Sequence, residues 1–126
     1  MVILDTNLLI DFIHRPNLAD SELEKFLKEN PQTDLSISVI TIQELYVGQS
    51  SKDPKKEQMF LNLIKSLRVL PYELKTAKLA GEIIRDSKTS LSFPDAAIAA
   101  TTILSKAKLL TLNKKDYEKI KKLKLI

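Results

Sequence analysis

The sequence contains no cysteine and a single histidine, His14. Disulfide bonds and thiolate metal sites are therefore excluded, and one imidazole cannot build a histidine-rich metal centre. No apolar run reaches the length of a membrane span, and the chain meets an acid at Asp5 before any basic segment or long apolar stretch has occurred. We therefore expect a cytoplasmic protein without a signal peptide or a membrane segment.

Length and composition favour one domain. The chain has 126 residues, of which 44% are hydrophobic, so residues 1–126 are expected to fold as a single unit around a substantial core. The net charge is +4, and it would be +8 outside a pocket that held four of the acids. Such a surface attracts a polyanion such as RNA, although a lysine-rich surface also serves solubility alone.

No two-residue hairpin signal interrupts the alternation of short apolar runs with segments of helical periodicity. This alternation predicts a three-layer α/β/α sandwich with a central, mainly parallel sheet. The expected strands are 2–5, 35–38, 68–71, 108–112 and 123–126. One helix is expected directly after Asp5, and another after a capping residue at Asp20 or Ser21. Further helices are expected at 41–47, 53–66, 73–85, 96–100 and 113–120. Gly48 is expected to close the helix 41–47, and residues 87–91 are expected to form a loop.

Four acids lie where a strand gives way to a helix or where a helix opens. Because the ends of parallel strands and the starts of the helices that follow them share one edge of a sheet, this fold would bring the four carboxylates together. Carboxylate oxygens are hard ligands, which suit Mg²⁺ or Mn²⁺ better than structural zinc. Water activated at such a site would attack phosphorus and leave 5′-phosphate and 3′-hydroxyl ends. The predicted catalytic and metal-binding acids are Asp5, Glu44, Asp95 and Asp116.

Each of these acids also has a purely structural explanation. A capping residue stands three positions before Glu44, Asp95 and Asp116, and an acid in the first helical turn stabilises a helix by roughly 0.3 to 1 kcal/mol. Asp5 is placed to cap the helix that begins near Thr6. The two explanations differ in electrostatic energy, because only the shared site brings the carboxylates together. Two like charges about 5 Å apart repel by roughly 3 kcal/mol at an effective dielectric near 20. A cluster of four acids therefore raises its own pKa values or binds a divalent cation.

Four motifs together resemble those of a known family. The first motif, 5–11, begins with Asp5-Thr6-Asn7, and the second, 38–45, ends with Glu44-Leu45. The third, 93–100, begins with Phe93-Pro94-Asp95, and the fourth, 111–117, ends with Asp116-Tyr117. In their order and spacing, over nearly the whole chain, these motifs are similar to those of PIN-domain ribonucleases. The small size resembles the VapC toxins of type II toxin–antitoxin pairs.

The resemblance implies a central parallel sheet flanked by helices, a Mg²⁺- or Mn²⁺-dependent endoribonuclease, and an antitoxin protein that blocks the active site. Asp5, Glu44 and Asp95 match the family's metal-binding acids. Asp116 matches a fourth acid, and Asn113 stands where other members can carry one. Tyr117 stands where phenylalanine is common, a difference that we expect to change little. The polar residues expected around the metal site are Thr6, Asn7, Thr111 and Asn113.

Several residues other than the four acids have two interpretations. Lys114 and Lys115 are candidate contacts to RNA, and a solvated basic face explains them equally well. The amphipathic segments 22–27 and 53–66 either carry a homodimer or antitoxin contact or serve the protein's own core. Core packing rather than stacking on bases is expected of the aromatic residues near the acids, which are Tyr46, Phe93 and Tyr117.

Three other functions compete with a toxin ribonuclease. A haloacid-dehalogenase-like phosphatase needs a second aspartate two residues after the first, where this chain has Asn7. A phosphate-sensing receiver domain needs paired acids after its first strand, and here Thr6 follows Asp5. A PIN domain that processes RNA outside a toxin–antitoxin pair, or that serves only as a scaffold, is the third. Metal-dependent RNA cleavage by the purified chain separates a nuclease from a scaffold and from a receiver.

Overall fold

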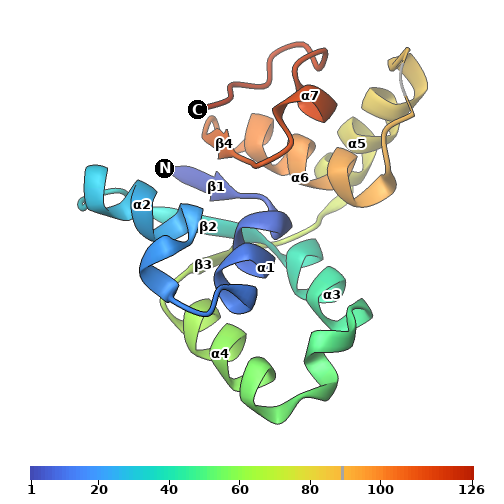
Figure 1. Ribbon diagram of the computed structural model, residues 1–126. Coiled ribbons are helices and arrows are strands. Elements are labelled where there is room, and N and C mark those ends of the chain that lie inside the picture. The colour runs from blue at the N-terminus through green and yellow to red at the C-terminus, as the bar shows by residue number, and fades with distance from the viewer. Residues whose placement is uncertain (89) are drawn as a thin grey trace.

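The structure is a computed structural model that describes residues 1–88 and 90–126. Its strands are β1 (Val2–Leu4), β2 (Leu35–Ser38), β3 (Arg68–Leu70) and β4 (Lys108–Leu110). They form a parallel sheet with the order β3-β2-β1-β4. Helices cover both faces of this sheet (Figure 1), which confirms the predicted α/β/α sandwich with a parallel centre.

Helices connect the strands in chain order, as a parallel sheet requires. Between β1 and β2 lie α1 (Thr6–His14), the 3₁₀ helix η1 (Leu18–Asp20) and α2 (Glu22–Glu29). Between β2 and β3 lie α3 (Val39–Val47), the 3₁₀ helix η2 (Gln49–Lys52) and α4 (Pro54–Lys65). Between β3 and β4 lie α5 (Leu74–Asp86) and α6 (Phe93–Leu104), and α7 (Lys114–Tyr117) follows β4. No helix in the described part of the chain combines the length and apolar character that crossing a membrane needs.

The sheet separates two apolar layers because successive residues of a strand face opposite sides. Val2 and Leu4 of β1 pack in a cluster with side chains of α1, α2, α3 and α4. Ile3, between them, packs on the other face against Ile98 and Ala99 of α6. All three residues of β1 are buried, as expected for the inner strand of a covered parallel sheet. The position of β1 therefore fixes the place of the residue that follows it, Asp5.

The C-terminal segment departs from the prediction. The expected strand 123–126 is present only as an isolated parallel bridge between Leu109 and Leu125, and the expected helix 113–120 is the single turn of α7. Lys122 has a φ of 68°, a left-handed conformation that neither a helix nor a strand accommodates. The chain turns at this residue, so regular structure does not extend through it.

Two helix starts differ from the prediction, whereas α3 ends at Gly48 as predicted. Helix α3 begins at Val39 rather than Thr41, because the Ser38 hydroxyl accepts the Ile40 N–H at 3.1 Å and caps the helix earlier. Similarly, α6 begins at Phe93 rather than at residue 96. The polar stretch 49–56, which the sequence predicts to be a loop that opens the next helix, contains the 3₁₀ helix η2. Gly48 ends α3 with an extended backbone, φ −72° and ψ 157°, so it does not use the left-handed conformation that glycine permits. Residue 89, in the predicted loop 87–91, lies outside the described residues.

Candidate active site at the carboxyl edge of the sheet

Asp5 lies at the edge of the sheet where β1 ends and α1 begins. Its Oδ1 accepts the Thr6 N–H at 2.8 Å, so it caps α1 as predicted. Its own N–H donates to the carbonyl of Leu110 at 2.9 Å, which ties it to the end of β4. The residue is 4% exposed. Asp5 is therefore a buried carboxylate whose backbone is fixed by two neighbouring strands.

Polar residues after β4 support Asp5 from the other side. The Thr111 hydroxyl donates to Asp5 Oδ2 at 2.7 Å, and its oxygen accepts the Asn113 N–H at 3.0 Å and the Asn7 side-chain amide at 3.4 Å. Asn7 also accepts the Leu112 N–H at 3.3 Å. The structure thus places Asn7 and Thr111 around Asp5, whereas Asn113 contributes its backbone N–H.

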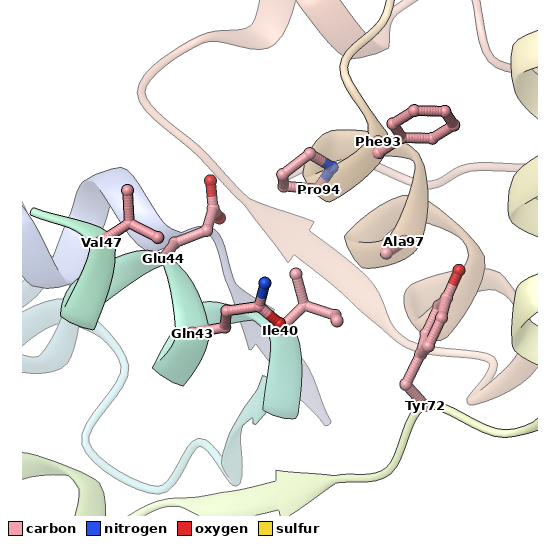
Figure 2. A pocket seen from close by; sticks show the side chains of 8 residues that line it. All are labelled: Ile40, Gln43, Glu44, Val47, Tyr72, Phe93, Pro94 and Ala97. Carbon is pink, nitrogen blue, oxygen red and sulfur yellow. The ribbon is translucent and has the colours of Figure 1, made fainter.

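Glu44 reaches the same region from α3. Its Oε1 accepts the Thr6 hydroxyl at 2.6 Å, and the Thr41 hydroxyl lies 3.0 Å from that of Thr6. Thr6 therefore contacts one acid through its backbone and a second through its side chain. Figure 2 shows Glu44 directed from α3 toward Pro94 of α6.

Asp95 enters from the first turn of α6. Its N–H donates to the Ser92 hydroxyl at 3.2 Å, which is the capping interaction that the sequence predicts. Its Oδ1 accepts the hydroxyl of Tyr117 at 3.0 Å. Tyr117 is 1% exposed, so this hydrogen bond is made from inside the protein. The backbone of Asp95 and its carboxylate are thus held by two different elements.

The charges of the three acids influence one another. Burial raises the pKa of Asp5, the hydrogen bond from Thr111 opposes this rise, and the charge of Asp95 adds to it. Burial also raises the pKa of Glu44, and the charges of Asp5 and Asp95 raise it further, against the hydrogen bond from Thr6. The pKa of Tyr117 is raised by burial and by the same two aspartates. Asp5, Glu44 and Asp95 therefore form one acid cluster, and that name is kept for them below.

Asp116 lies outside the acid cluster. Its side chain is exposed on α7 and makes no hydrogen bond with any residue in the described ranges 1–88 and 90–126. Its N–H donates to the carbonyl of Asn113 at 3.1 Å. Lys114 and Lys115 are exposed beside it. Of the four acids that the sequence singles out, the structure brings three together and leaves the fourth at the surface.

The chemistry of the acid cluster fits a hard divalent cation, since its donors are carboxylate oxygens supported by hydroxyl groups. Oε2 of Glu44 and Oδ2 of Asp95 accept no hydrogen bond from the described residues, so both are available as ligands. Within the same residues, no three acidic, histidine or cysteine side chains already form a metal cage. Shared binding of one ion therefore requires the carboxylates to close in from the positions described.

A cleft of about 380 Å³ opens beside Glu44, between α3 and α6 (Figure 2). Phe93, on its wall, is 81% exposed, so the expected core packing of this residue is wrong. The reason is the early start of α6, which places Phe93 in its exposed first turn. Tyr117 is buried as expected. Tyr46 is 43% exposed, so it is not a core residue, although its ring packs edge-to-face on Phe60 with ring centroids 5.3 Å apart. The cleft is lined by Ile40, Gln43, Glu44, Val47, Tyr72, Phe93, Pro94 and Ala97.

Sequence reasoning gave too little weight to two residues. Thr41 was assigned only to capping, yet it lies beside Thr6 and Glu44, and the three-residue spacing from Glu44 places both on one helical face. Tyr117 was expected to differ little from phenylalanine, yet its hydroxyl donates to Asp95. The position of Tyr117, directly after the candidate acid Asp116 in a site motif, was the sequence feature that could have indicated this role.

Comparisons with known proteins identify the family of this chain. The model of the PIN domain family matches residues 2–123. Ribonuclease VapC1 of Rickettsia felis is 31% identical over 98 residues, which cover 71% of this chain and 73% of that protein. The structure resembles VapBC2 of Rickettsia felis bound to a promoter DNA fragment, with a TM-score of 0.80 and 27% identity over 100% of this chain and 98% of that one. DNA-bound VapBC from Salmonella typhimurium has the same fold, with a TM-score of 0.82 and 24% identity over 99% and 96% of the two chains. The chain therefore belongs to the PIN domain family.

Proposed function

We propose that this chain is an endoribonuclease of the VapC type and the toxin of a toxin–antitoxin pair. The observation that carries the proposal is the meeting of Asp5, Glu44 and Asp95, which come from three separate elements of a PIN domain. The name of the similar ribonuclease VapC1 supports RNA as the substrate. The similar VapBC complexes support an antitoxin as the partner.

The acid cluster is the proposed site for Mg²⁺ or Mn²⁺, with Asp5, Glu44 and Asp95 as ligands. When bound there, such an ion would neutralise charge on the scissile phosphate and lower the pKa of a water molecule, so that the water loses a proton more readily and its oxygen can attack phosphorus. Carboxylates alone would repel the RNA backbone, so binding of substrate depends on that neutralisation. The exposed Asp116 is proposed as an auxiliary acid only.

The residues around the acid cluster orient it before substrate arrives. Thr6 and Thr111 engage both oxygens of Asp5, and Thr6 also fixes one oxygen of Glu44. Preset geometry of this kind removes part of the entropic cost of reaching the transition state. The exposed Lys114 and Lys115 on α7 are proposed to contact RNA phosphates.

Protein partners are proposed on the side of the cleft. The side chains of Val47 and Phe93, which line the cleft, are exposed by 76 and 81%, and large apolar groups so exposed favour a protein contact. An antitoxin and a second copy of this chain are the proposed occupants, and the mass of the purified protein in solution tests the second. With this activity and these partners, the protein is proposed to act in the cytoplasm, as expected from the sequence.

The test combines purified protein and living cells. The purified chain is incubated with structured and unstructured RNA in the presence of MnCl₂ or EDTA, and expression is induced in a bacterial host with and without the Asp5→Asn substitution. We expect internal RNA cleavage that EDTA abolishes, and growth arrest that Asp5→Asn relieves. RNA binding without cleavage in the presence of MnCl₂ would favour a scaffold instead, and labelling by a small phosphate donor would favour a receiver.

A further inference from the structure

The hydroxyl of Tyr117 stands between two members of the acid cluster. It donates to Asp95 Oδ1 at 3.0 Å, and it is also close enough to Asp5 to lower the pKa of that carboxyl. The side chain comes from α7, after β4, and the residue is 1% exposed. One neutral hydroxyl, hydrogen-bonded to Asp95, thus lies beside two carboxylates that repel each other.

The ring and the hydroxyl of Tyr117 have separate roles. The ring packs with Ile3, Ile98, Ala99 and Leu109 in the apolar layer on the α6 side of the sheet. A phenylalanine ring would fill the same space, so packing does not require the hydroxyl. A buried hydroxyl is costly unless it is paired, and the partners that this one finds are the acids of the cluster. The hydroxyl therefore acts on the acids rather than on the core.

Asp95 depends on this contact more than Asp5 does. Both oxygens of Asp5 accept hydrogen bonds, from the Thr6 N–H and the Thr111 hydroxyl. Within the described residues, the hydroxyl of Tyr117 is the one donor that engages the carboxylate of Asp95. Without it, repulsion from Asp5 favours rotation of the Asp95 side chain away from the cluster. Because Oδ1 alone is engaged, Oδ2 stays free for a ligand role.

We propose that Tyr117 is a positioning residue, whose hydroxyl holds Asp95 facing Asp5 so that both carboxylates can bind one divalent cation. This inference rests on the proposed function, because the acid cluster is the proposed metal site. Residues that orient metal ligands through hydrogen bonds typically contribute about 10- to 100-fold in metal affinity. The hydroxyl of Tyr117 is expected at the lower end of this range, because it engages one oxygen of one ligand.

The test compares Tyr117→Phe with a matched control, Tyr46→Phe. Tyr46 also donates its hydroxyl to a carboxylate, Glu57 Oε2 at 2.8 Å, outside the acid cluster. Mn²⁺ binding is measured by titration calorimetry without RNA, and folding is checked by circular dichroism and thermal unfolding. We expect Tyr117→Phe to weaken Mn²⁺ binding about tenfold and Tyr46→Phe to leave it unchanged. Equal or tighter Mn²⁺ binding by folded Tyr117→Phe would overturn the inference.

A double-mutant cycle shows whether the hydroxyl acts through Asp95. In an Asp95→Asn background, Tyr117→Phe should cause no further loss of Mn²⁺ affinity, and a further tenfold loss there would overturn the positioning role. If Tyr117→Phe also lowers the stability of the protein, the same cycle still separates the two causes. A loss of Mn²⁺ affinity that comes from misfolding would persist in the Asp95→Asn background, whereas a loss that comes from Asp95 would not. Since calorimetry uses no RNA, a wild-type chain that binds Mn²⁺ but cuts no RNA would refute the ribonuclease and leave the role of Tyr117 intact.

Discussion

The hydroxyl of Thr111 lies 2.7 Å from Oδ2 of Asp5, although 106 positions separate the two residues in the sequence. They meet because β1 and β4 are parallel neighbours, with Leu4 paired to Leu110. The residues that follow such a pair emerge at the same edge of the sheet. The side chain after the last strand thereby orients the acid after the first.

Removing one charge from the acid cluster should separate activity from stability. We expect Asp95→Asn to lower the rate of RNA cleavage on the order of 100-fold or more, since it removes a group that stabilises charge in the transition state. In EDTA its melting temperature should stay level or rise, because one repulsive charge is gone. Asp86→Asn, which alters an exposed acid paired with Arg85, is the control and should cleave normally. A stability loss of about 1 kcal/mol with full activity would show that Asp95 serves only its helix.

The stability of the metal-free protein should depend on pH through Glu44. The pKa of Glu44 is raised above its usual value of 4.5, so between 4.5 and the raised value the folded protein binds more protons than the unfolded chain. The contribution of Glu44 to the free energy of unfolding is therefore greatest at low pH and declines as pH rises through this window. Glu44→Gln, which does not titrate, should melt above the wild type at pH 7, and calorimetry in EDTA should show this advantage shrinking toward pH 4.5. A difference in melting temperature between wild type and Glu44→Gln that is the same at all pH values would contradict a raised pKa of Glu44.

Divalent metal should stabilise the folded protein. A ligand that binds only the native state, at 100 times its Kd, adds about 2.7 kcal/mol to the free energy of unfolding. We expect the melting temperature to rise with MnCl₂ and to return to its original value after EDTA is added. Asp95→Asn should show a much smaller rise. An equal rise in wild type and variant would place the metal elsewhere.

The ends of the RNA products should report the nucleophile. Attack by water yields a 5′-phosphate and a 3′-hydroxyl and makes no use of the 2′-hydroxyl. A substrate with a single 2′-deoxynucleotide on the 5′ side of the cut should therefore be cleaved at a similar rate. Mass spectrometry of the fragments checks both expectations, and a cyclic 2′,3′-phosphate would refute this chemistry.

Loss of the cap on α6 should lower stability. The Ser92 hydroxyl accepts the N–H of Asp95 at 3.2 Å, and replacing such a cap with alanine typically costs about 1 kcal/mol. We expect Ser92→Ala to unfold at lower urea concentration with an unchanged slope. Because Asp95 keeps its hydrogen bond to Tyr117, RNA cleavage should fall much less than in Asp95→Asn. Similar activity losses in both variants would show that the cap itself positions the acid.

The sheet and three of the acids could be predicted because their causes are local. Short apolar runs ended by polar residues mark strand ends, and parallel pairing carries those ends to one edge whatever the intervening helices do. Asp5 directly follows β1, and Asp95 lies in the first turn of α6. Glu44 lies in the second turn of α3, because that helix begins at Val39 rather than at the predicted Thr41. Capping interactions and candidate site residues coincide at Asp5 and Asp95, so the capping explanation holds at both positions and does not exclude the proposed functional one.

The remainder depended on packing over long distances. The left-handed turn at Lys122 ends regular structure in the C-terminal segment, and no local propensity announces it. Asp116 and Tyr117 are adjacent in the sequence, yet one is exposed and the other is buried against the acid cluster. Which of two neighbours points inward is decided by how a one-turn helix docks on the sheet. Spacing alone does not contain that information.

The inner position of β1 also bears on how the protein is made. Its neighbour β4, and the side chains of Thr111 and Tyr117 that support the acid cluster, come after β2 and β3 in the chain. A growing polypeptide therefore carries an incomplete acid cluster until β4 and α7 have been synthesised. Folding that relies on such distant contacts is comparatively slow. Assembly of the acid cluster is thus a late step in the formation of the fold, set by the order of the strands.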